Sequence, residues 1–143
     1  MKKMKYALTL AMVTVLAMAH LACKDDVFNK FYRKQPKLEY TRDDPDMWSG
    51  LETEHLPVVT FNADREPDMD VRVNLENPTP THYIEAIGIM DENRNDIVSK
   101  QFDANTKVFE ARFFSASLPK NKKLKVYAKC SLHDLWTEPL KLP

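Results

Sequence analysis

The chain has 143 residues, and its 21 basic and 21 acidic side chains give a formal net charge of zero. This length accommodates one domain with a real core, and it makes a second domain unexpected. Removing three leader lysines leaves the rest mildly acidic, which gives no support to a nucleic-acid partner.

The first 22 residues have the pattern of a bacterial export signal. Three lysines precede a mostly apolar run over residues 6–22, which is too short and isolated to favour a permanent spanning helix. The run ends in Ala22-Cys23, a small residue before a cysteine, as at a lipoprotein processing site. We therefore expect a lipid on Cys23 and attachment to the periplasmic face of a bacterial membrane. An ordinary cleaved signal, or an uncleaved anchor, is the alternative.

The remainder divides into a polar linker and a β-domain. Residues 23–50 are charged and irregular, which is typical of a tether. From Leu56 onward, short β-branched and aromatic runs alternate with Asn, Asp and Pro clusters, which favours antiparallel strands. The predicted strands cover residues 57–62, 70–76, 82–90, 97–102, 108–115, 124–132 and 137–142. We predict an all-β fold, an antiparallel β-sandwich of about seven strands over residues 51–143, with no convincing helix.

Four side chains after the leader are candidate metal ligands: His55, His82, Cys130 and His133. Strand alternation places Cys130 inward, at the end of the 124–132 strand, and places His82 on one face with Ile84 and Ala86. Each of the four lies near a strand end, where side chains from different strands can converge. Imidazole and thiolate donors suit iron, copper or zinc.

Each candidate ligand also has a structural explanation when it is considered alone. A free cysteine is usually a small buried hydrophobe, and a single histidine at a strand end is more often a surface or satisfied side chain. The coincidence of all four at strand ends favours a metal. If Cys23 carries a lipid, Cys130 has no partner for an intramolecular disulfide, which also favours metal binding in an exported protein.

Three motifs in order resemble the iron-binding domain of the superoxide reductases, the neelaredoxin and desulfoferrodoxin group. They are His55-Leu-Pro-Val-Val, Asn77-Pro-x-x-x-His82-Tyr-Ile-Glu and Cys130-x-x-His133-x-Leu-Trp136. The resemblance covers roughly residues 52–142 and implies an immunoglobulin-like sandwich with one mononuclear iron. In that family four equatorial histidines and an axial cysteine hold the iron, and superoxide is reduced to hydrogen peroxide with electrons from a separate donor.

By position, the resemblance implies that His55, His82 and His133 are equatorial ligands and that Cys130 is the axial thiolate. The fourth histidine is missing, because Asn77 opens the loop where the family has His-Pro. Asn77, the carboxylate of Glu76 or a water molecule is expected to fill that place.

Two further positions are implied by the resemblance. Thr53-Glu54 stands where the family usually has Glu-Lys, so Glu54 would put a negative charge where a lysine attracts the anionic substrate. Trp136 is expected to pack behind the metal.

Several functions remain open at this point. The first is an exported, lipid-anchored iron protein that reduces superoxide with electrons from an unidentified donor. The alternative is a relative that binds a metal or a partner without reducing superoxide, such as an electron carrier. A blue-copper carrier is a third possibility, although no methionine follows Cys130. A purely structural sandwich is the fourth.

Overall fold

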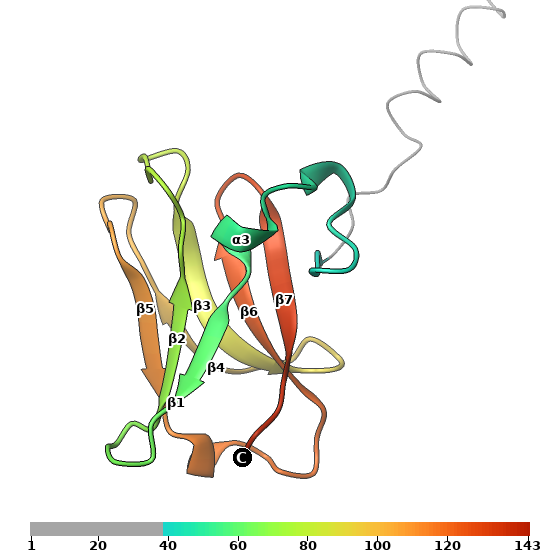
Figure 1. Cartoon of the computed structure of the whole chain (residues 1–143), viewed down its shortest axis with the longest axis vertical. Coiled ribbons are helices and arrows are strands. Elements are labelled where there is room, and N and C mark those ends of the chain that lie inside the picture. Colours follow the sequence, from blue (N-terminus) through green and yellow to red (C-terminus); the bar gives the residue numbers. More distant parts are fainter. Residues whose placement is uncertain (1–38) are drawn as a thin grey trace, which may run out of the picture. The chain divides into compact units, whose positions relative to one another are not determined.

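The computed structural model describes residues 39–143, so the predicted signal peptide, Cys23 and the first part of the predicted linker lie outside the described residues. Seven strands form the domain (Figure 1): β1 (Val58–Phe61), β2 (Met69–Val73), β3 (Ile84–Asp91), β4 (Asp96–Gln101), β5 (Phe109–Phe113), β6 (Leu124–Cys130) and β7 (Asp134–Leu140). Three short helical segments accompany them: η1 (Asp46–Trp48), α3 (Glu52–His55) and η2 (Ser115–Ser117). The predicted all-β class and strand number are confirmed.

The strands form two antiparallel sheets, one in the order β1-β2-β5 and the other in the order β4-β3-β6-β7. The predicted sandwich is therefore confirmed. An immunoglobulin constant domain pairs its fourth strand into the sheet of the first, second and fifth strands. Here β4 instead pairs with β3, which leaves a sheet of three strands and a sheet of four. Among residues 39–143 no helix has the length and apolar character needed to cross a membrane.

The core lies between the inner faces of the two sheets. On β5, Phe109, Ala111 and Phe113 are buried while the residues between them are exposed, as strand alternation requires. Cys130 is also buried in this core, together with the inward residues of β6. Its predicted inward orientation is confirmed. Burying each large aliphatic or aromatic side chain contributes about 1.5–3 kcal/mol, so the core holds both sheets in a fixed relation.

The predicted alternation along β3 is wrong beyond Ile84. The pairing of β3 with β6 shifts register between Ile84 and Ala86, which is the effect of a β-bulge. Ile84 lies in the main core, whereas Ala86 belongs to a separate cluster with Met90 and Tyr127. His82 itself precedes β3 and forms an isolated bridge with Thr79. The extra residue therefore separates the face of Ala86 from that of Ile84.

Part of the predicted linker packs against the sandwich. Tyr40 is only 1% exposed and forms a parallel bridge with Trp136 on β7. Its amide donates to the carbonyl of Leu135, and its carbonyl accepts from Thr137, at 2.8 Å in both bonds. Leu56 completes this small cluster. The compact part of the chain thus includes described residues earlier than 51.

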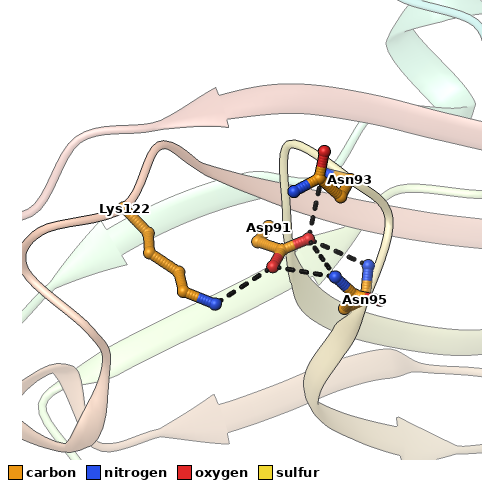
Figure 2. A network of polar contacts seen from close by, with 4 residues as sticks. All are labelled: Asp91, Asn93, Asn95 and Lys122. Carbon is orange, nitrogen blue, oxygen red and sulfur yellow. Dashed lines mark hydrogen bonds and ion pairs between the residues drawn. The ribbon is translucent and has the colours of Figure 1, made fainter.

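A turn at the far end of β3 is closed by one buried carboxylate, Asp91 (Figure 2). It accepts bonds from the amides of Asn93 and Asn95 at 3.0 Å, and from the Asn95 side chain at 3.1 Å. Lys122 lies 3.1 Å from its second oxygen. These donors lower the pKa of Asp91 to about 2, with the Asn95 bonds as the largest cause. This turn is a closed structural network.

Candidate metal site

His55 is held at the end of the single helical turn α3. A residue before a proline disfavours the helical backbone conformation. Leu56, which precedes Pro57, is therefore extended, and the helical turn ends there. The ring nitrogen Nδ1 of His55 lies 3.0 Å from the carbonyl oxygen of Leu51, to which it donates. This bond leaves Nε2 without a proton and turns its lone pair toward the other histidines. The sequence predicts no helix here, and this prediction is wrong. A four-residue turn has too little periodicity to detect.

His82 enters from the loop between β2 and β3. The His82 amide donates to the Thr79 carbonyl at 3.0 Å and to the Thr79 hydroxyl at 3.1 Å. The His82 carbonyl accepts from the Thr79 amide at 2.9 Å. This small turn fixes the backbone at the point where the imidazole leaves it. His82 is half-buried, whereas His55 is completely buried.

Cys130 and His133 lie on either side of the tight turn between β6 and β7. Asp134 closes that turn with φ of 60°, a left-handed conformation that aspartate tolerates better than most residues. Ser131 ties this turn to the His82 segment. Its hydroxyl accepts from the Tyr83 amide at 3.0 Å and donates to the Thr81 carbonyl at 3.1 Å. The two segments that carry three of the candidate ligands are therefore fastened to each other.

Two tryptophans enclose the imidazoles. Trp136, fully buried, stacks on His55 with ring centroids 5.4 Å apart, so its predicted place behind the site is confirmed. Trp48, from η1, lies against His133 at 4.6 Å. Within residues 39–143 the buried indole nitrogens of both tryptophans have no hydrogen-bond partner. These rings shield two of the three imidazoles from water.

The structure brings the predicted ligands together in one group. The ligand atoms of His55, His82, Cys130 and His133 all lie within 4.8 Å of one another. Nε2 of His55 is 3.2 Å from Nε2 of His82 and 2.8 Å from Nδ1 of His133. The sulfur of Cys130 is 3.8 Å from that same Nδ1. Helix, loop and strand ends thus present one sulfur and three nitrogens to a common point.

These donors fit a metal ion. Each neutral imidazole carries a single N–H. Ring nitrogens that face one another can therefore form hydrogen bonds only by sharing protons. Burial lowers the pKa of His55 to about 4 and also lowers the pKa of His133, so both rings are neutral with lone pairs available at neutral pH. Burial raises the pKa of the Cys130 thiol, and a cation in the centre would favour its thiolate. One cation would satisfy all four groups together.

The remaining predicted site residues lie outside this group. Glu76 and Asn77 are exposed, and Glu76 is not among the acidic, histidine and cysteine side chains whose ligand atoms meet. Asn77 has φ of 50°, a conformation in which asparagine is enriched. Its part as a fourth equatorial ligand stays a prediction. Glu54 is half-buried on α3, next to His55, and its effect on substrate also stays a prediction.

Three contributors to the site were missed from the sequence. They are the Leu51 carbonyl, the Ser131 hydroxyl and the Trp48 ring. The Leu51 carbonyl is a backbone group, and the Ser131 hydroxyl bonds to a segment that is distant in sequence. Residue types alone reveal neither contact. Trp48 lay in a stretch whose charge suggested a linker, although an aromatic residue shortly before the His55 motif was a usable signal.

Known proteins resemble this chain in sequence and in fold. A family model described as desulfoferrodoxin matches residues 48–139. A variant of superoxide reductase (neelaredoxin) from Ignicoccus hospitalis is 21% identical, with a TM-score of 0.51, over 74% of this chain and 95% of its own. Superoxide reductase from Giardia intestinalis is 24% identical, with a TM-score of 0.48, over 62% of this chain and 98% of its own.

At 21% identity the likeness to the Ignicoccus hospitalis structure concerns the fold alone, and no curated protein matches the sequence. The family model is the stronger finding, because its match extends from Trp48 past Trp136 and includes all four grouped ligands. The chain therefore belongs to the desulfoferrodoxin family of superoxide-reductase-like domains.

Proposed function

We propose that this protein binds one mononuclear iron ion and reduces superoxide to hydrogen peroxide. The observation that carries the proposal is the convergence of three imidazole nitrogens and one buried sulfur in a chain of this family. Nitrogen and thiolate donors together suit iron(II), and a bound iron would supply one electron to superoxide while two protons complete hydrogen peroxide.

The chain's own residues would prepare that chemistry. The Leu51 carbonyl, 3.0 Å from Nδ1 of His55, fixes the tautomer and direction of the ring, and a hydrogen-bonded imidazole is a more basic ligand. The Cys130 thiolate would donate negative charge to the site from within the core. Trp48 and Trp136 exclude water from two of the imidazoles. The side of the half-buried His82 is the more open one for a small anion.

A stoichiometric assay tests the proposed reaction. The full chain is loaded with iron and reduced chemically, and superoxide is then generated by pulse radiolysis. We expect one hydrogen peroxide for each superoxide consumed, with no dioxygen released, because a reductase donates an electron whereas a dismutase returns half of the superoxide as dioxygen. Dioxygen release at half the superoxide consumed would contradict reduction.

A second candidate is a metal-binding or electron-transfer relative that does not reduce superoxide. It is favoured by the three histidines in the cluster and by the acidic side chain of Glu54 beside His55. Such a protein would bind iron with the same four groups and exchange one electron with a partner. In the same experiment, reduced iron that survives the superoxide pulse unoxidised would establish this candidate over the first.

We also propose that the chain is exported and anchored to a bacterial membrane by a lipid on Cys23. The support is the sequence alone, in which Ala22-Cys23 follows an apolar run preceded by lysines. Labelled fatty acid should appear in the wild-type protein and disappear in Cys23→Ala. Unlabelled wild-type protein released with the soluble periplasmic fraction would exclude the anchor.

A further inference from the structure

We infer that the ammonium group of Lys107 attracts the anionic substrate to the metal site from the side of His82. This inference rests on the proposed function, because superoxide is an anion and its reduction begins with an encounter at the grouped ligands. Lys107 acts through its positive charge and is not a metal ligand. A cation beside the entrance to a site favours anions over neutral molecules of similar size, so Lys107 contributes to specificity.

One hydrogen bond holds Lys107 beside the turn that carries His82. The Nζ of Lys107, in the β4–β5 connection, donates to the carbonyl oxygen of Pro78, in the β2–β3 connection, at 3.1 Å. Pro78 is the chain neighbour of Thr79, whose backbone pairs with that of His82 at 2.9 and 3.0 Å. Pro78 and His82 are four residues apart, which limits their separation to about 14 Å even in an extended chain. The two backbone bonds of the turn bring them closer than this limit.

The positive charge of Lys107 is not neutralised by a carboxylate. The carbonyl that it contacts is uncharged, and no ion pair within residues 39–143 includes Lys107. Lys129 lies next to Cys130, but a carboxylate oxygen of Glu85 is 2.7 Å from its ammonium group. Lys100 on β4 turns toward β5 and donates to the carbonyl of Glu110 at 2.8 Å. Lys107 therefore presents a free positive charge on the His82 side.

The connections between strands at the metal end contain no other basic residue. They are β2–β3 (residues 74–83), β4–β5 (residues 102–108) and β6–β7 (residues 131–133), and Figure 1 shows them at one end of the sandwich. Lys107 is the only lysine or arginine in these connections. Glu76 and Asp103 belong to them too, but neither forms an ion pair with Lys107. His82 is the partly exposed one of the three imidazoles, so the cation lies on the side that a small anion can enter.

The effect of one exposed charge should depend on salt. At 0.01 M ionic strength the Debye length is about 30 Å, longer than the limit of about 14 Å between Pro78 and His82, whereas at 1 M it is about 3 Å. Loss of the Lys107 charge should therefore weaken anion binding by about threefold at 0.01 M and leave it unchanged at 1 M.

Azide binding tests this expectation, because azide is a small anion that ligates iron without being reduced by it. The full chain, extracted in detergent, is loaded with iron and oxidised, and azide binding is followed by visible absorption at both salt concentrations. Lys107→Gln should raise the azide dissociation constant about threefold at 0.01 M and leave it unchanged at 1 M. Lys107→Arg keeps the charge and should match the wild type. The second-order rate with superoxide should fall in Lys107→Gln by a similar factor.

Two controls separate the charge from other effects. Lys120→Gln removes the same charge from the β5–β6 connection, at the opposite end of the sandwich, and should leave the azide dissociation constant within about 1.5-fold of the wild type. Nitric oxide is neutral, so its affinity for the reduced iron should be equal in wild type and Lys107→Gln. This second control measures whether the substitution disturbs the metal site itself.

Three outcomes would overturn the inference. The first is an azide affinity that Lys107→Gln leaves unchanged at 0.01 M, and the second is an equal loss in Lys120→Gln, which would reflect net charge. The third is a loss that persists at 1 M or appears equally with nitric oxide, which would make the bond to Pro78 structural. Failure of the proposed function would appear separately, as iron that binds azide in the expected pattern but is not oxidised by superoxide.

Discussion

Two buried polar clusters lie at opposite ends of β3, and they are built differently. At the Asp91 end, one carboxylate accepts from three nitrogens of the turn and from Lys122, so each of these donors faces an acceptor (Figure 2). At the His82 end, three ring nitrogens and one sulfur converge without enough donors to satisfy them. A buried cluster that closes on its own hydrogen bonds is structural, whereas one whose lone pairs face each other requires a cation.

The largest expected difference between the clusters is their response to metal removal. Metal at about a thousandfold excess over its dissociation constant should stabilise the native state by about 4 kcal/mol, because only the folded chain assembles the ligands. His55→Ala should abolish most of this increment. Asp91→Asn should lower the stability of the metal-free and metal-loaded forms alike. Thermal unfolding with and without a chelator measures both.

Wild-type unfolding that a chelator leaves unchanged would contradict this difference between the clusters. So would loss of the metal-dependent increment in Asp91→Asn as complete as in His55→Ala. Either result would mean that the converging nitrogens are not what binds metal.

Charge reversal beside each cluster should change the rate with superoxide by different amounts. Glu54→Lys should raise the second-order rate with superoxide by about tenfold at low salt, because attraction replaces repulsion of the anion. Glu92→Lys makes the same change beside Asp91, at the other end of β3, and should alter the rate much less. Pulse radiolysis at two ionic strengths measures both variants. A larger change of rate in Glu92→Lys than in Glu54→Lys would show that Glu54 does not face the substrate.

The two clusters should lose stability in different pH ranges. Burial lowers the pKa of His55 to about 4 from an ordinary value of 6.5, so protonation favours the unfolded chain. The metal-free protein should therefore lose stability as pH falls from 6.5 toward 4. Hydrogen bonds lower the pKa of Asp91 to about 2 from 3.8, so its stabilisation should persist above 4 and disappear as pH falls toward 2.

Matched variants assign the two pH ranges. Denaturant unfolding of metal-free His55→Gln should show a weaker pH dependence between 6.5 and 4, and that of Asp91→Asn a weaker dependence between 4 and 2. Metal binding should shift the first range to lower pH, since bound imidazoles resist protonation. If metal-free His55→Gln lost as much stability between pH 6.5 and 4 as the wild type, that loss would belong to other groups.

The smallest expected effect concerns Ser131, which fastens the Cys130 turn to the His82 segment. Ser131→Ala leaves the Tyr83 amide without its 3.0 Å side-chain acceptor and should destabilise the domain by about 1 kcal/mol. Because the ligands lose part of their alignment, metal affinity should also fall, by severalfold. The control is Ser117→Ala, because the Ser117 hydroxyl donates to the carbonyl of Phe114, directly before η2. Equal metal affinities in the two variants would argue against a positioning role for Ser131.

Two features could be predicted from the sequence: strand faces, which follow from alternating residues, and metal ligands, which follow from scarce residue types. The alternation of β6 located Cys130 in the core, and the scarcity of histidine and cysteine identified the four grouped ligands. The bulge at Ile84 could not be predicted, because register depends on the partner strand. Tyr40 and Trp48 were missed because their burial depends on β7 and His133, which are distant in sequence.

Metal analysis after anaerobic reconstitution tests whether one iron binds to His55, His82, Cys130 and His133. We predict about one iron per full chain, with a visible thiolate-to-iron charge-transfer band in the oxidised protein that Cys130→Ser abolishes. Asp91→Asn should keep both the iron and the band. A wild-type preparation that remains colourless and free of iron after reconstitution would contradict the claim.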